Sequence, residues 1–545
     1  MCGFVAIVGA AEPQELQRMA EAVALRGPDD SGSCDLAPFH AIHHRLAIVG
    51  PDPRGRQPMT IGAITVLFNG CIYNYPQLRR ELEADGVEFV SGSDTEILPH
   101  LYLRHGRDMF ALLNGMFAIV IWDARRQQVV AARDGAGEKP LFICRQGGRI
   151  GFASMLSAFE RGSWQLEPRV AAVAELLTTM RIEAPRTLYR EVSQLPAGGV
   201  VEAGIGAPLR FSRFSALPPA EAPADSWVHN PTAAALEERI DAAFALRMLS
   251  DKPLGIFLSG GVDSSVIAAS LASQSSVPLH TFAVRFAGGG ADYDETPFAT
   301  EVAHRLGTTH QTLVVKPSAD ATVDAIATAF DQPVTNAAAL PTYLISQAAK
   351  QFVDVALSGV GGDELFGGYP RYLGIKWHSS MRHIPGRGLA LLLLEAVGDS
   401  DSSRNLPGRL RRFVSGLQQE PAAAYRQWMR SCSDSASVML TQPVEQGGDE
   451  WPTVAESAGG LAELLKRYGV VNGAMAYDQC SYLADDLLPV ADRMSMAHGL
   501  EMRAPFLDRE LMCDALWLGA RYKVDGPPWR EGLKLLLREV ACRRL

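Results

Sequence analysis

The second residue of this 545-residue chain is a cysteine that directly follows the initiator methionine. Removal of the methionine would leave Cys2 with a thiol nucleophile and an α-amine base in one residue. The pKa of a free α-amine is about 8, so the amine can accept a proton near neutral pH. A cysteine at this position is more often only a small buried residue, so its interpretation depends on the segments that accompany it.

A second candidate for chemistry is the segment 258–265, which reads Leu-Ser-Gly-Gly-Val-Asp-Ser-Ser. It follows a predicted buried strand and begins a predicted helix, so backbone N–H groups and the helix dipole can bind anionic oxygens there. Asp263 is placed to hold Mg²⁺ against phosphates. Because the Gly-Lys-Ser/Thr ending of a Walker A loop is missing, the segment indicates a different nucleotide loop. The alternative is a flexible glycine turn.

The elements that must position these residues differ along the chain. Apolar, β-branched segments within the first two hundred residues predict an antiparallel, strand-rich fold with a few helices, and its strands are expected at residues 5–8, 66–68, 116–122 and 129–132. The dipeptide Asn69-Gly70 is a turn signal beside one of these strands. A proline-rich linker follows, and Asn230 is the predicted cap of a helix whose first residue is Pro231.

Beyond the linker, apolar strands alternate with helices, a pattern that is typical of a parallel α/β sheet. Strands are predicted at residues 254–258, 280–284 and 353–357, and a helix at residues 262–272. From about residue 375 to residue 500 the pattern is mainly helical.

Composition limits the function classes. Apolar residues make up 47% and charged residues 21% of the chain, which is typical of a globular protein with ample core. A net charge of −10 argues against a nucleic-acid partner. No apolar run approaches the roughly 18 residues of a membrane helix, so no membrane partner is expected. The eight scattered cysteines predict free thiols and a cytoplasmic location.

Several ordered segments accompany Cys2 in the first two hundred residues. They are 1–4, 26–29, 44–49, 69–74, 93–96, 115–118, 133–134, 139–141 and 152–154. Together they resemble the class II glutamine amidotransferase domain, an α+β N-terminal-nucleophile glutaminase with antiparallel sheets layered with helices. We expect this domain to span residues 1–210 and the linker to span residues 211–230.

The resemblance implies roles for particular residues. Cys2 would attack the side-chain amide of glutamine to give a glutamyl thioester and ammonia, and the Asn69 side chain and Gly70 N–H would form the oxyanion hole. Arg45 would bind the glutamine carboxylate and Asp94 the ammonium. The expected glutamine pocket comprises Arg45, Ile48, Val49, Asn69, Gly70, Cys71 and Asp94.

Cys71 departs from the family motif, which is usually Asn-Gly-Glu with the Glu near the glutamine ammonium. A thiol is a weak acceptor. Loss of an acceptor for a charged group could cost about 1.5–3 kcal/mol of glutamine binding, so a high KM for glutamine is expected. The alternative is a rearranged pocket in which Asp94 alone suffices.

The second half resembles the ATP pyrophosphatase domain of glutamine-dependent asparagine synthetases, whose relatives include β-lactam synthetase and lasso-peptide cyclase. The segments that carry the resemblance are 258–265, 293–295, 358–369, 495–508 and 534–538. The resemblance implies a parallel-sheet α/β domain with a helical C-terminal part, expected at residues 231–545. Relatives continue past the lysine-bearing helix with a basic tail; the given sequence stops at Leu545, so a more open synthetase pocket is expected.

The resemblance also implies a site for the cofactors ATP and Mg²⁺. Asp263 and Asp363 would bind Mg²⁺, and Lys534 would neutralise charge that develops at the α-phosphate. The residues expected to bind ATP are Leu258, Ser259, Gly260, Gly261, Asp263, Ser264, Ser265, Val284, Ser358 and Gly359. Val360 stands where the family usually has an acid, so a carboxylate acceptor other than aspartate is plausible.

The leading hypothesis is therefore an amidotransferase that adenylates aspartate or a tailored acid, passes ammonia from glutamine through an internal channel, and releases an amide, AMP and pyrophosphate. One alternative is intramolecular amide formation with another amine, as in the ring-closing relatives. Another is a non-catalytic binding subunit, which Cys71, Val360 and the short tail would favour. The resemblance further suggests a homodimer.

Overall fold

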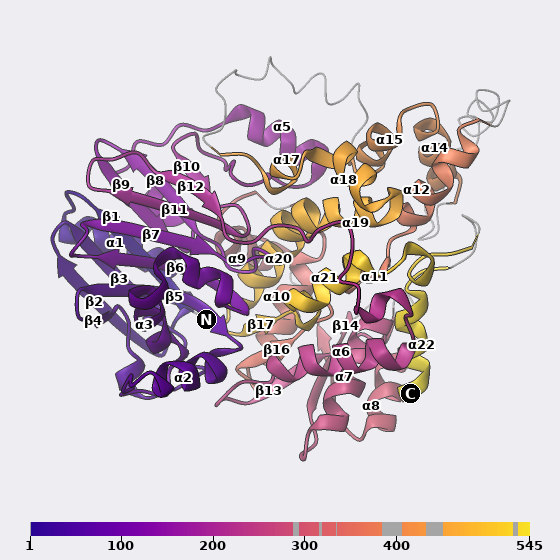
Figure 1. The fold of residues 1–545 in the computed structure, drawn as a ribbon, viewed down its shortest axis with the longest axis horizontal. Helices are drawn as coiled ribbons and strands as arrows, with labels where there is room; N and C mark the ends of the chain where they lie inside the picture. Colours follow the sequence, from indigo (N-terminus) through magenta and orange to yellow (C-terminus); the bar gives the residue numbers. More distant parts are fainter. Residues whose placement is uncertain are drawn as a thin grey trace.

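The computed structural model describes residues 2–286, 294–315, 319–333, 335–383, 406–431, 451–526 and 532–545. Met1 and Tyr293, which belong to the segments of family resemblance, lie outside these ranges. Figure 1 shows a strand-rich N-terminal half that lies against a C-terminal half in which helices surround a smaller sheet. None of the helices in the described ranges combines the length and apolar character of a membrane-spanning helix.

Two six-stranded antiparallel sheets form the N-terminal half. The first has the order β10-β8-β9-β1-β3-β2, and the second has the order β12-β11-β7-β6-β5-β4. The strands of the first sheet are β1 (Cys2–Val8), β2 (Asp30–Leu36), β3 (Phe39–Arg45), β8 (Phe142–Gln146), β9 (Arg149–Ala153) and β10 (Val192–Gln194). Those of the second are β4 (Met59–Ile61), β5 (Ile64–Ile72), β6 (Gly115–Asp123), β7 (Gln128–Arg133), β11 (Gly199–Gly204) and β12 (Arg210–Arg213).

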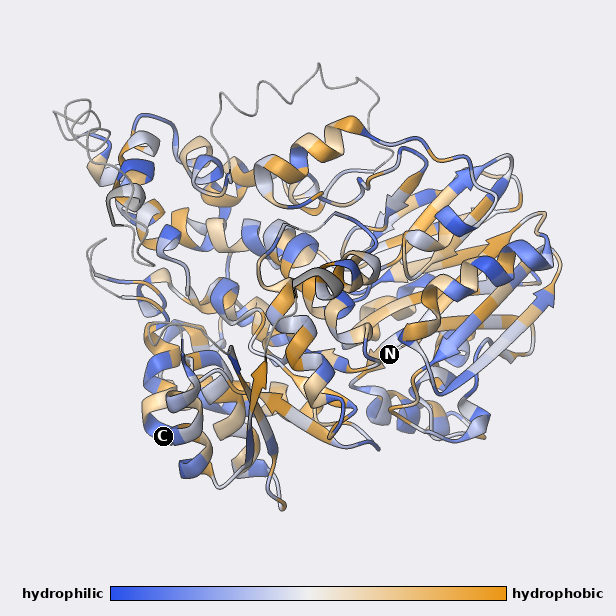
Figure 2. Ribbon diagram, turned by 180° about the vertical axis from the view of Figure 1, so that it is seen from behind, coloured by the Kyte–Doolittle hydropathy of each residue, from blue (hydrophilic) through white to orange (hydrophobic). Residues whose placement is uncertain are grey.

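The two sheets lie face to face, with helices on their outer faces. Successive side chains of a strand point to opposite faces, so apolar residues at every position are buried on both sides of each sheet. In β6, Val120 and Trp122 pack between the sheets, where Trp122 stacks on Phe39 at 5.6 Å. Ile119 and Ile121 pack on the other face of the second sheet with the helices that cover it. The helices of this half are α1 (Pro13–Val23), α2 (Tyr75–Ala84), α3 (Ile97–His105), α4 (Ser157–Arg161) and α5 (Val170–Thr179). Figure 2 shows hydrophobic residues along many of the central strands.

The predicted turn at Asn69-Gly70 is wrong. Both residues belong to β5, which pairs with β6 without interruption from Ile64 to Ile72. A side chain at position 70 would place its Cβ 2.0 Å from the Met116 carbonyl oxygen. Glycine is therefore required here by the close approach of two paired strands, and the local turn propensity is overridden by nine paired residues.

The predicted parallel sheet is present in the C-terminal half as five strands in the order β15-β14-β13-β16-β17. They are β13 (Leu254–Phe257), β14 (His280–Phe286), β15 (Thr309–Val315), β16 (Val355–Leu357) and β17 (Glu501–Arg503). The helices around this sheet include α6 (Ala233–Leu246), α7 (Val262–Gln274), α8 (Thr296–Leu306), α9 (Ala319–Phe330), α10 (Ala339–Ala349) and α22 (Leu535–Arg544). The strand β17 lies at the edge of the sheet.

A largely helical region connects β16 to β17, as the sequence predicts. Its described helices are α11 (Gly362–Phe366), α12 (Pro370–Met381), α14 (Leu406–Gly416), α15 (Pro421–Trp428), α17 (Val454–Ser457), α18 (Gly460–Tyr468), α19 (Val470–Asp478) and α20 (Leu488–Met496), with a π-helical segment at Gln479–Leu487. The helix α21 (Arg509–Trp517) follows β17.

The junction between the halves corrects one sequence prediction. Helix α6 is capped by Thr232, whose hydroxyl accepts a 3.1 Å hydrogen bond from the Ala235 N–H, and Asn230 lies before the cap. The hydroxyl of a residue with extended backbone satisfies an N–H group of the first turn, which Asn230 is too early in the chain to reach.

Buried ion pairs join the halves, because Asp492 of α20 contacts Arg26 at 2.8 Å and Lys139 at 3.2 Å.

Two candidate active sites

The first candidate site lies where the two N-terminal sheets meet. Cys2 begins β1 and pairs with Arg45 at the end of β3, while Asn69, Gly70 and Cys71 belong to β5 of the other sheet. A pocket at this place is lined by Cys2, Arg45, Leu46, Ile48, Val49, Gln57, Phe68, Gly70, Cys71, Ser93, Asp94, Thr95 and Glu501. The structure therefore brings together the residues that the sequence predicts for glutamine binding, and Asn69 contacts Cys2 directly.

The Asn69 side chain is oriented by its contact with Cys2. Its Oδ1 accepts a 2.9 Å hydrogen bond from the Cys2 backbone N–H. Its Nδ2 is buried and has no hydrogen-bond partner among the described residues. A buried amide donor without a partner is costly unless a ligand satisfies it. The free Nδ2 next to Cys2 therefore fits a donor for an oxyanion that forms during attack by the thiol.

The Cys2 thiol is fully enclosed in this pocket. Burial raises its pKa, and the Arg45 charge opposes this shift. The thiol is therefore mostly protonated at neutral pH, so attack requires a base. The α-amine that removal of Met1 would expose belongs to the same residue and can supply that base.

Arg45 and Asp94 hold opposite charges at fixed positions of the pocket. The Arg45 guanidinium donates hydrogen bonds to the Gly50 carbonyl at 2.5 Å and to the Asp52 carbonyl at 2.9 Å, so the loop after β3 wraps around it. Asp94 Oδ2 accepts a 3.0 Å bond from the Ile72 N–H. Burial raises the pKa of Asp94 to about 6. This pair suits the carboxylate and ammonium groups of a free amino acid.

Sequence reasoning missed two residues at this site, and both come from the other half of the chain. Glu501 of β17 lines the pocket, and Arg503 of the same strand places Nη2 3.7 Å from the Cys71 Sγ. Their side chains form an ion pair with an N···O distance of 2.6 Å. Both residues belong to the segment 495–508, which is one of those that resemble the synthetase family. The spacing of Glu501 and Arg503 indicates only that their side chains share one face of a strand. Nothing in it indicates which pocket they reach.

The second candidate site lies at the ends of β13 and β16, where neighbouring strands of the parallel sheet lead into two loops. After β13, the Ser259 hydroxyl accepts a 3.2 Å bond from the Gly261 N–H and lies 3.1 Å from the Ser264 hydroxyl. Gly260 has a φ of 83°, and a Cβ there would lie 2.7 Å from Ala299 N. The loop therefore needs glycine, and it opens directly into the N-terminus of α7, where anions bind favourably.

The loop after β16 packs against the first one. A Cβ at Gly359 would lie 3.1 Å from the Asp263 Cβ, and one at Gly362 would lie 2.6 Å from the Asp263 Cγ. Ser358 donates its N–H to the Arg503 carbonyl at 2.9 Å. Leu258 is buried and donates its N–H to Phe282 in β14, two residues before Val284. Most of the predicted nucleotide residues thus lie at the carboxyl ends of the strands of the parallel sheet.

Lys534 connects these two loops. Its ammonium lies 2.5 Å from Asp263 Oδ2 and 2.6 Å from Asp363 Oδ1. Lys534 was expected on a helix, but it precedes α22 and has a φ of 54° in the left-handed region. The residue therefore leaves the helix axis and points its side chain at the carboxylates.

Asp263 and Asp363 form an acidic pair whose surroundings suit a magnesium ion. Burial raises the pKa of Asp263 to about 6, and the nearby Lys534 charge opposes this shift. Asp263 Oδ1 is buried and has no partner among the described residues, so it is available to a cation. No group of three or more His, Cys, Asp or Glu side chains in the described ranges could hold a metal alone. Two carboxylates with phosphate oxygens and waters are a usual set of Mg²⁺ ligands, so the residues fit.

A small cavity adjoins both sites. Its lining includes Arg503, whose side chain contacts Cys71, and Ser358 and Val360 from the loop after β16. Glu138 also lines this cavity, and burial raises its pKa to about 8. Val360 therefore lines this cavity at the position where an acid was expected from the family.

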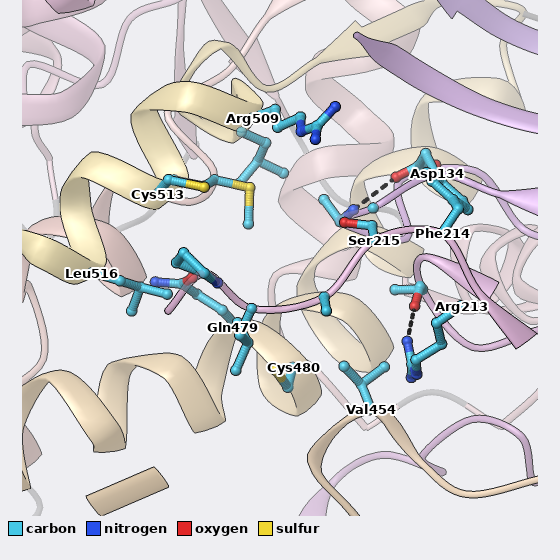
Figure 3. Close-up of a pocket in the computed structure, with 18 of the residues that line it drawn as sticks. Asp134, Arg213, Phe214, Ser215, Val454, Gln479, Cys480, Arg509, Cys513 and Leu516 are labelled. Atoms are coloured by element: carbon cyan, nitrogen blue, oxygen red, sulfur yellow. Dashed lines mark hydrogen bonds between the residues drawn. The ribbon is translucent and has the colours of Figure 1, made fainter. Parts of the chain in front are cut away.

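A larger pocket lies between the halves and has a volume of about 440 Å³ (Figure 3). Arg213, Phe214 and Ser215 line it from the end of the N-terminal half, and Gln479 and Arg509 line it from the other half. It shares Glu138 with the small cavity but contains none of the predicted glutamine or nucleotide residues.

The fold and the two sites define a class: an N-terminal-nucleophile glutamine amidotransferase domain joined to a parallel-sheet domain with a glycine-rich loop at the N-terminus of α7. Known families match both parts, because residues 1–208 match the glutamine amidotransferase domain and residues 235–545 match asparagine synthase. The chain belongs to the family of glutamine-hydrolysing asparagine synthetases.

Relatives in this family are similar over most of the chain. Glutamine-hydrolysing asparagine synthetase 1 of Bacillus subtilis is 30% identical over 93% of this chain and 80% of its own length. Asparagine synthetase 3 of the same organism is 28% identical over 94% of this chain and 80% of its own length. Asparagine synthetase 3 of Arabidopsis thaliana is 32% identical over 68% of this chain and 61% of its own length.

Proposed function

We propose that this chain hydrolyses glutamine at Cys2 and uses the ammonia to convert an ATP-activated carboxylate to its amide, with release of AMP and pyrophosphate. The observation that carries the proposal is that one residue of β17 contacts both sites: the Arg503 side chain lies 3.7 Å from the Cys71 sulfur of the glutamine pocket, and its carbonyl accepts the N–H of Ser358 in the nucleotide loop at 2.9 Å. Family membership supports the same reaction.

At the first site, the Cys2 thiol attacks the carboxamide carbon of glutamine and its proton passes to the α-amine that removal of Met1 exposes. The negative oxygen that forms is held by Asn69 Nδ2 and the Gly70 N–H. Collapse of this intermediate breaks the C–N bond, releases ammonia after the amine returns the proton, and leaves a glutamyl thioester. Water then hydrolyses the thioester to glutamate and regenerates the thiol.

At the second site, a carboxylate oxygen of the acceptor attacks the α-phosphorus of ATP and pyrophosphate leaves. The N-terminus of α7 and the serine hydroxyls of its loop bind phosphate oxygens, and Lys534 neutralises charge at the α-phosphate. Asp263 and Asp363 would hold Mg²⁺, which supplies positive charge to the leaving pyrophosphate. Ammonia then attacks the acyl carbon, and AMP leaves.

Val360 bears on which acceptor is used. Its isopropyl group lines the cavity between the sites and can neither accept a proton nor bind an ammonium group. We therefore propose a carboxylate acceptor that is either aspartate or an acid with a different side chain.

The seven described cysteines are free thiols, which supports a reducing, cytoplasmic location. Assembly as a homodimer stays a prediction.

The deciding experiment measures pyrophosphate and amide with ATP, Mg²⁺ and glutamine, first without an acceptor, then with aspartate, and then with a panel of carboxylic acids. We expect acceptor-dependent pyrophosphate with an equal amount of amide. Cys2→Ala should abolish synthesis from glutamine and retain synthesis from ammonium chloride. Adenylation without any amide from either nitrogen source would contradict the proposal.

A further inference from the structure

The pocket between the two halves belongs to neither candidate active site. It has a volume of about 440 Å³, and its lining includes Phe214 and Ser215, which follow β12, and Leu516 of α21. We propose that this pocket binds a small carboxylic acid with an apolar body, whose carboxylate pairs with Arg213. This binding does not depend on the proposed amidotransferase reaction, because none of the residues predicted to bind glutamine or ATP lines the pocket.

The size and the walls of the pocket suit an organic molecule. Pockets that hold small molecules commonly have volumes of about 300–1,000 Å³, with mostly apolar walls and a few polar groups. Apolar side chains reach this pocket from both halves, and they include Phe117, Phe214, Leu217, Met512, Leu516 and Trp517. The apolar body of a ligand would therefore be removed from water on several sides, which favours binding.

Arg213 is the polar residue on which the proposal depends. Its Nη1 donates to the Ala197 carbonyl at 2.5 Å and its Nε donates to the Ser457 hydroxyl at 3.2 Å, so both acceptors are neutral. Its Nη2 is buried and has no hydrogen-bond partner in the part of the chain that the structure describes. A guanidinium group that is partly removed from water without an opposite charge is costly, and a carboxylate that pairs with it offsets this cost.

No described acid supplies that opposite charge to Arg213. Burial lowers the pKa of Arg213, and the group that opposes this shift is the Cys480 thiol. Burial raises the pKa of Cys480 to about 12, so this thiol is neutral at physiological pH. The positive charge of Arg213 is therefore available to a ligand.

The other charged groups of the wall leave an excess of positive charge. Asp134 accepts five hydrogen bonds from backbone N–H groups at 2.7–3.2 Å, and Arg133 places an opposite charge beside it. Burial raises the pKa of Glu138 to about 8, so its carboxyl group is mostly protonated at neutral pH. Arg467 and Arg509 also line the pocket and donate to backbone carbonyls. The wall therefore favours an anion over a cation.

Gln479 adds a buried acceptor to the lining. It is 5% exposed, and its Nε2 donates to the Glu364 carbonyl at 3.2 Å, but its Oε1 has no partner among the described residues. Figure 3 shows the Gln479 side chain apart from that of Arg213, so the two can contact different ends of one ligand. An acid that carries a hydroxyl or N–H group at the end away from its carboxylate would satisfy both residues.

The test compares acids with their neutral amides on the full-length chain by ligand-observed NMR titration. The compounds are 4-hydroxyphenylacetate and indole-3-acetate, each with the primary amide of the same shape. We expect each acid to bind at least about tenfold more tightly than its amide, because the amide cannot pair with a guanidinium group. Arg213→Gln should weaken binding of the acids about tenfold and binding of the amides less than about twofold.

Arg210→Gln is the matched control. Arg210 is an exposed residue of the same strand, β12, and its replacement makes the same change of charge, but it does not line the pocket. The affinity for the acids should stay within about twofold in this variant. Thermal unfolding gives a second measurement, since a bound acid should raise the unfolding temperature of the unmodified chain and of Arg210→Gln more than that of Arg213→Gln.

Met512→Trp tests the same pocket without a change at Arg213. Met512 lines the pocket from α21, so the larger indole should fill the space and abolish binding of both acids. This variant decides the matter if Arg213→Gln does not fold.

Three results would overturn the proposal. They are equal affinity of the unmodified chain for acids and amides, no measurable binding of either acid, and binding of the acids that neither Arg213→Gln nor Met512→Trp weakens. The last result would place the acids at another site, such as that of the carboxylate acceptor. Because binding is measured without turnover, these outcomes are independent of whether the chain makes an amide.

Discussion

The ammonium of Lys534 donates a 2.5 Å hydrogen bond to Asp263 Oδ2, although 271 residues separate them in the chain. The contact is possible because Lys534 precedes α22 in a left-handed conformation and α22 packs on α7. It places the positive charge at the N-terminus of α7, where the phosphates of ATP are expected.

Replacement of Lys534 by methionine should therefore reduce acceptor-dependent pyrophosphate release about 100- to 1,000-fold, because charge at the α-phosphate is no longer neutralised. Glutamine hydrolysis should stay within about twofold. The control is Lys376→Met, since Lys376 also pairs with a carboxylate, Asp525, at 2.5 Å but lies outside both sites. Equal losses in the two variants would argue against a catalytic role for Lys534.

Asn69→Ala should reduce kcat for glutamine hydrolysis about 100- to 1,000-fold with a smaller effect on KM, because Nδ2 stabilises an oxyanion that exists only in the transition state and intermediate. Synthesis from ammonium chloride should be unaffected. Steady-state kinetics with both nitrogen sources provides the measurement. A decrease in kcat of less than about tenfold would exclude the assigned donor.

Cys71→Glu should lower the KM for glutamine about tenfold and leave kcat nearly unchanged, because it adds an acceptor for the ammonium group. Arg503, with Nη2 3.7 Å from the Cys71 sulfur, is placed to hold the new carboxylate.

Cys71→Gln separates charge from size in this experiment, since the Gln side chain at position 71 has the volume of the Glu side chain without its charge. We expect Cys71→Gln to leave the KM for glutamine unchanged or to raise it. If Cys71→Glu does not change the KM, the missing acid at position 71 does not limit glutamine binding.

Glu138 makes the stability of the enzyme depend on pH. Burial raises its pKa from 4.5 to about 8, so the folded chain binds a proton that the unfolded chain releases between these values. Its contribution to stability is present below about pH 4.5 and is lost as the pH rises through about 8. The charged groups that act on it are Asp134, Lys139, Arg247 and Arg503.

Glu138→Gln keeps the shape of the protonated acid and removes the titration. The variant should therefore melt at a higher temperature than the unmodified chain at pH 8, with a much smaller difference at pH 5. Thermal unfolding followed by circular dichroism at the two pH values gives the comparison. An equal difference at both pH values would show that Glu138 does not titrate in this range.

Local patterns in the sequence predicted much of the fold. The apolar, β-branched run at residues 116–122, which forms β6, and the buried strands of the C-terminal sheet were predicted correctly, because each depends on burial of nearby side chains. The turn expected at Asn69-Gly70 was wrong, because pairing along the whole of β5 outweighs the preference of two residues. The helix cap moved from Asn230 to Thr232 for a reason of backbone geometry that composition does not reveal.

For the candidate sites too, some features follow from the sequence and others only from the tertiary structure. The sequence by itself determined which residues can react, because a cysteine at position 2 and the glycine-rich loop before α7 owe their chemistry to neighbours a few residues away. Only the tertiary structure decided that Glu501 faces the Cys2 pocket and that Lys534 bridges Asp263 and Asp363. Electrostatic interactions fall off over a few ångströms, so charges carried by distant segments act on a site only where folding brings them into contact.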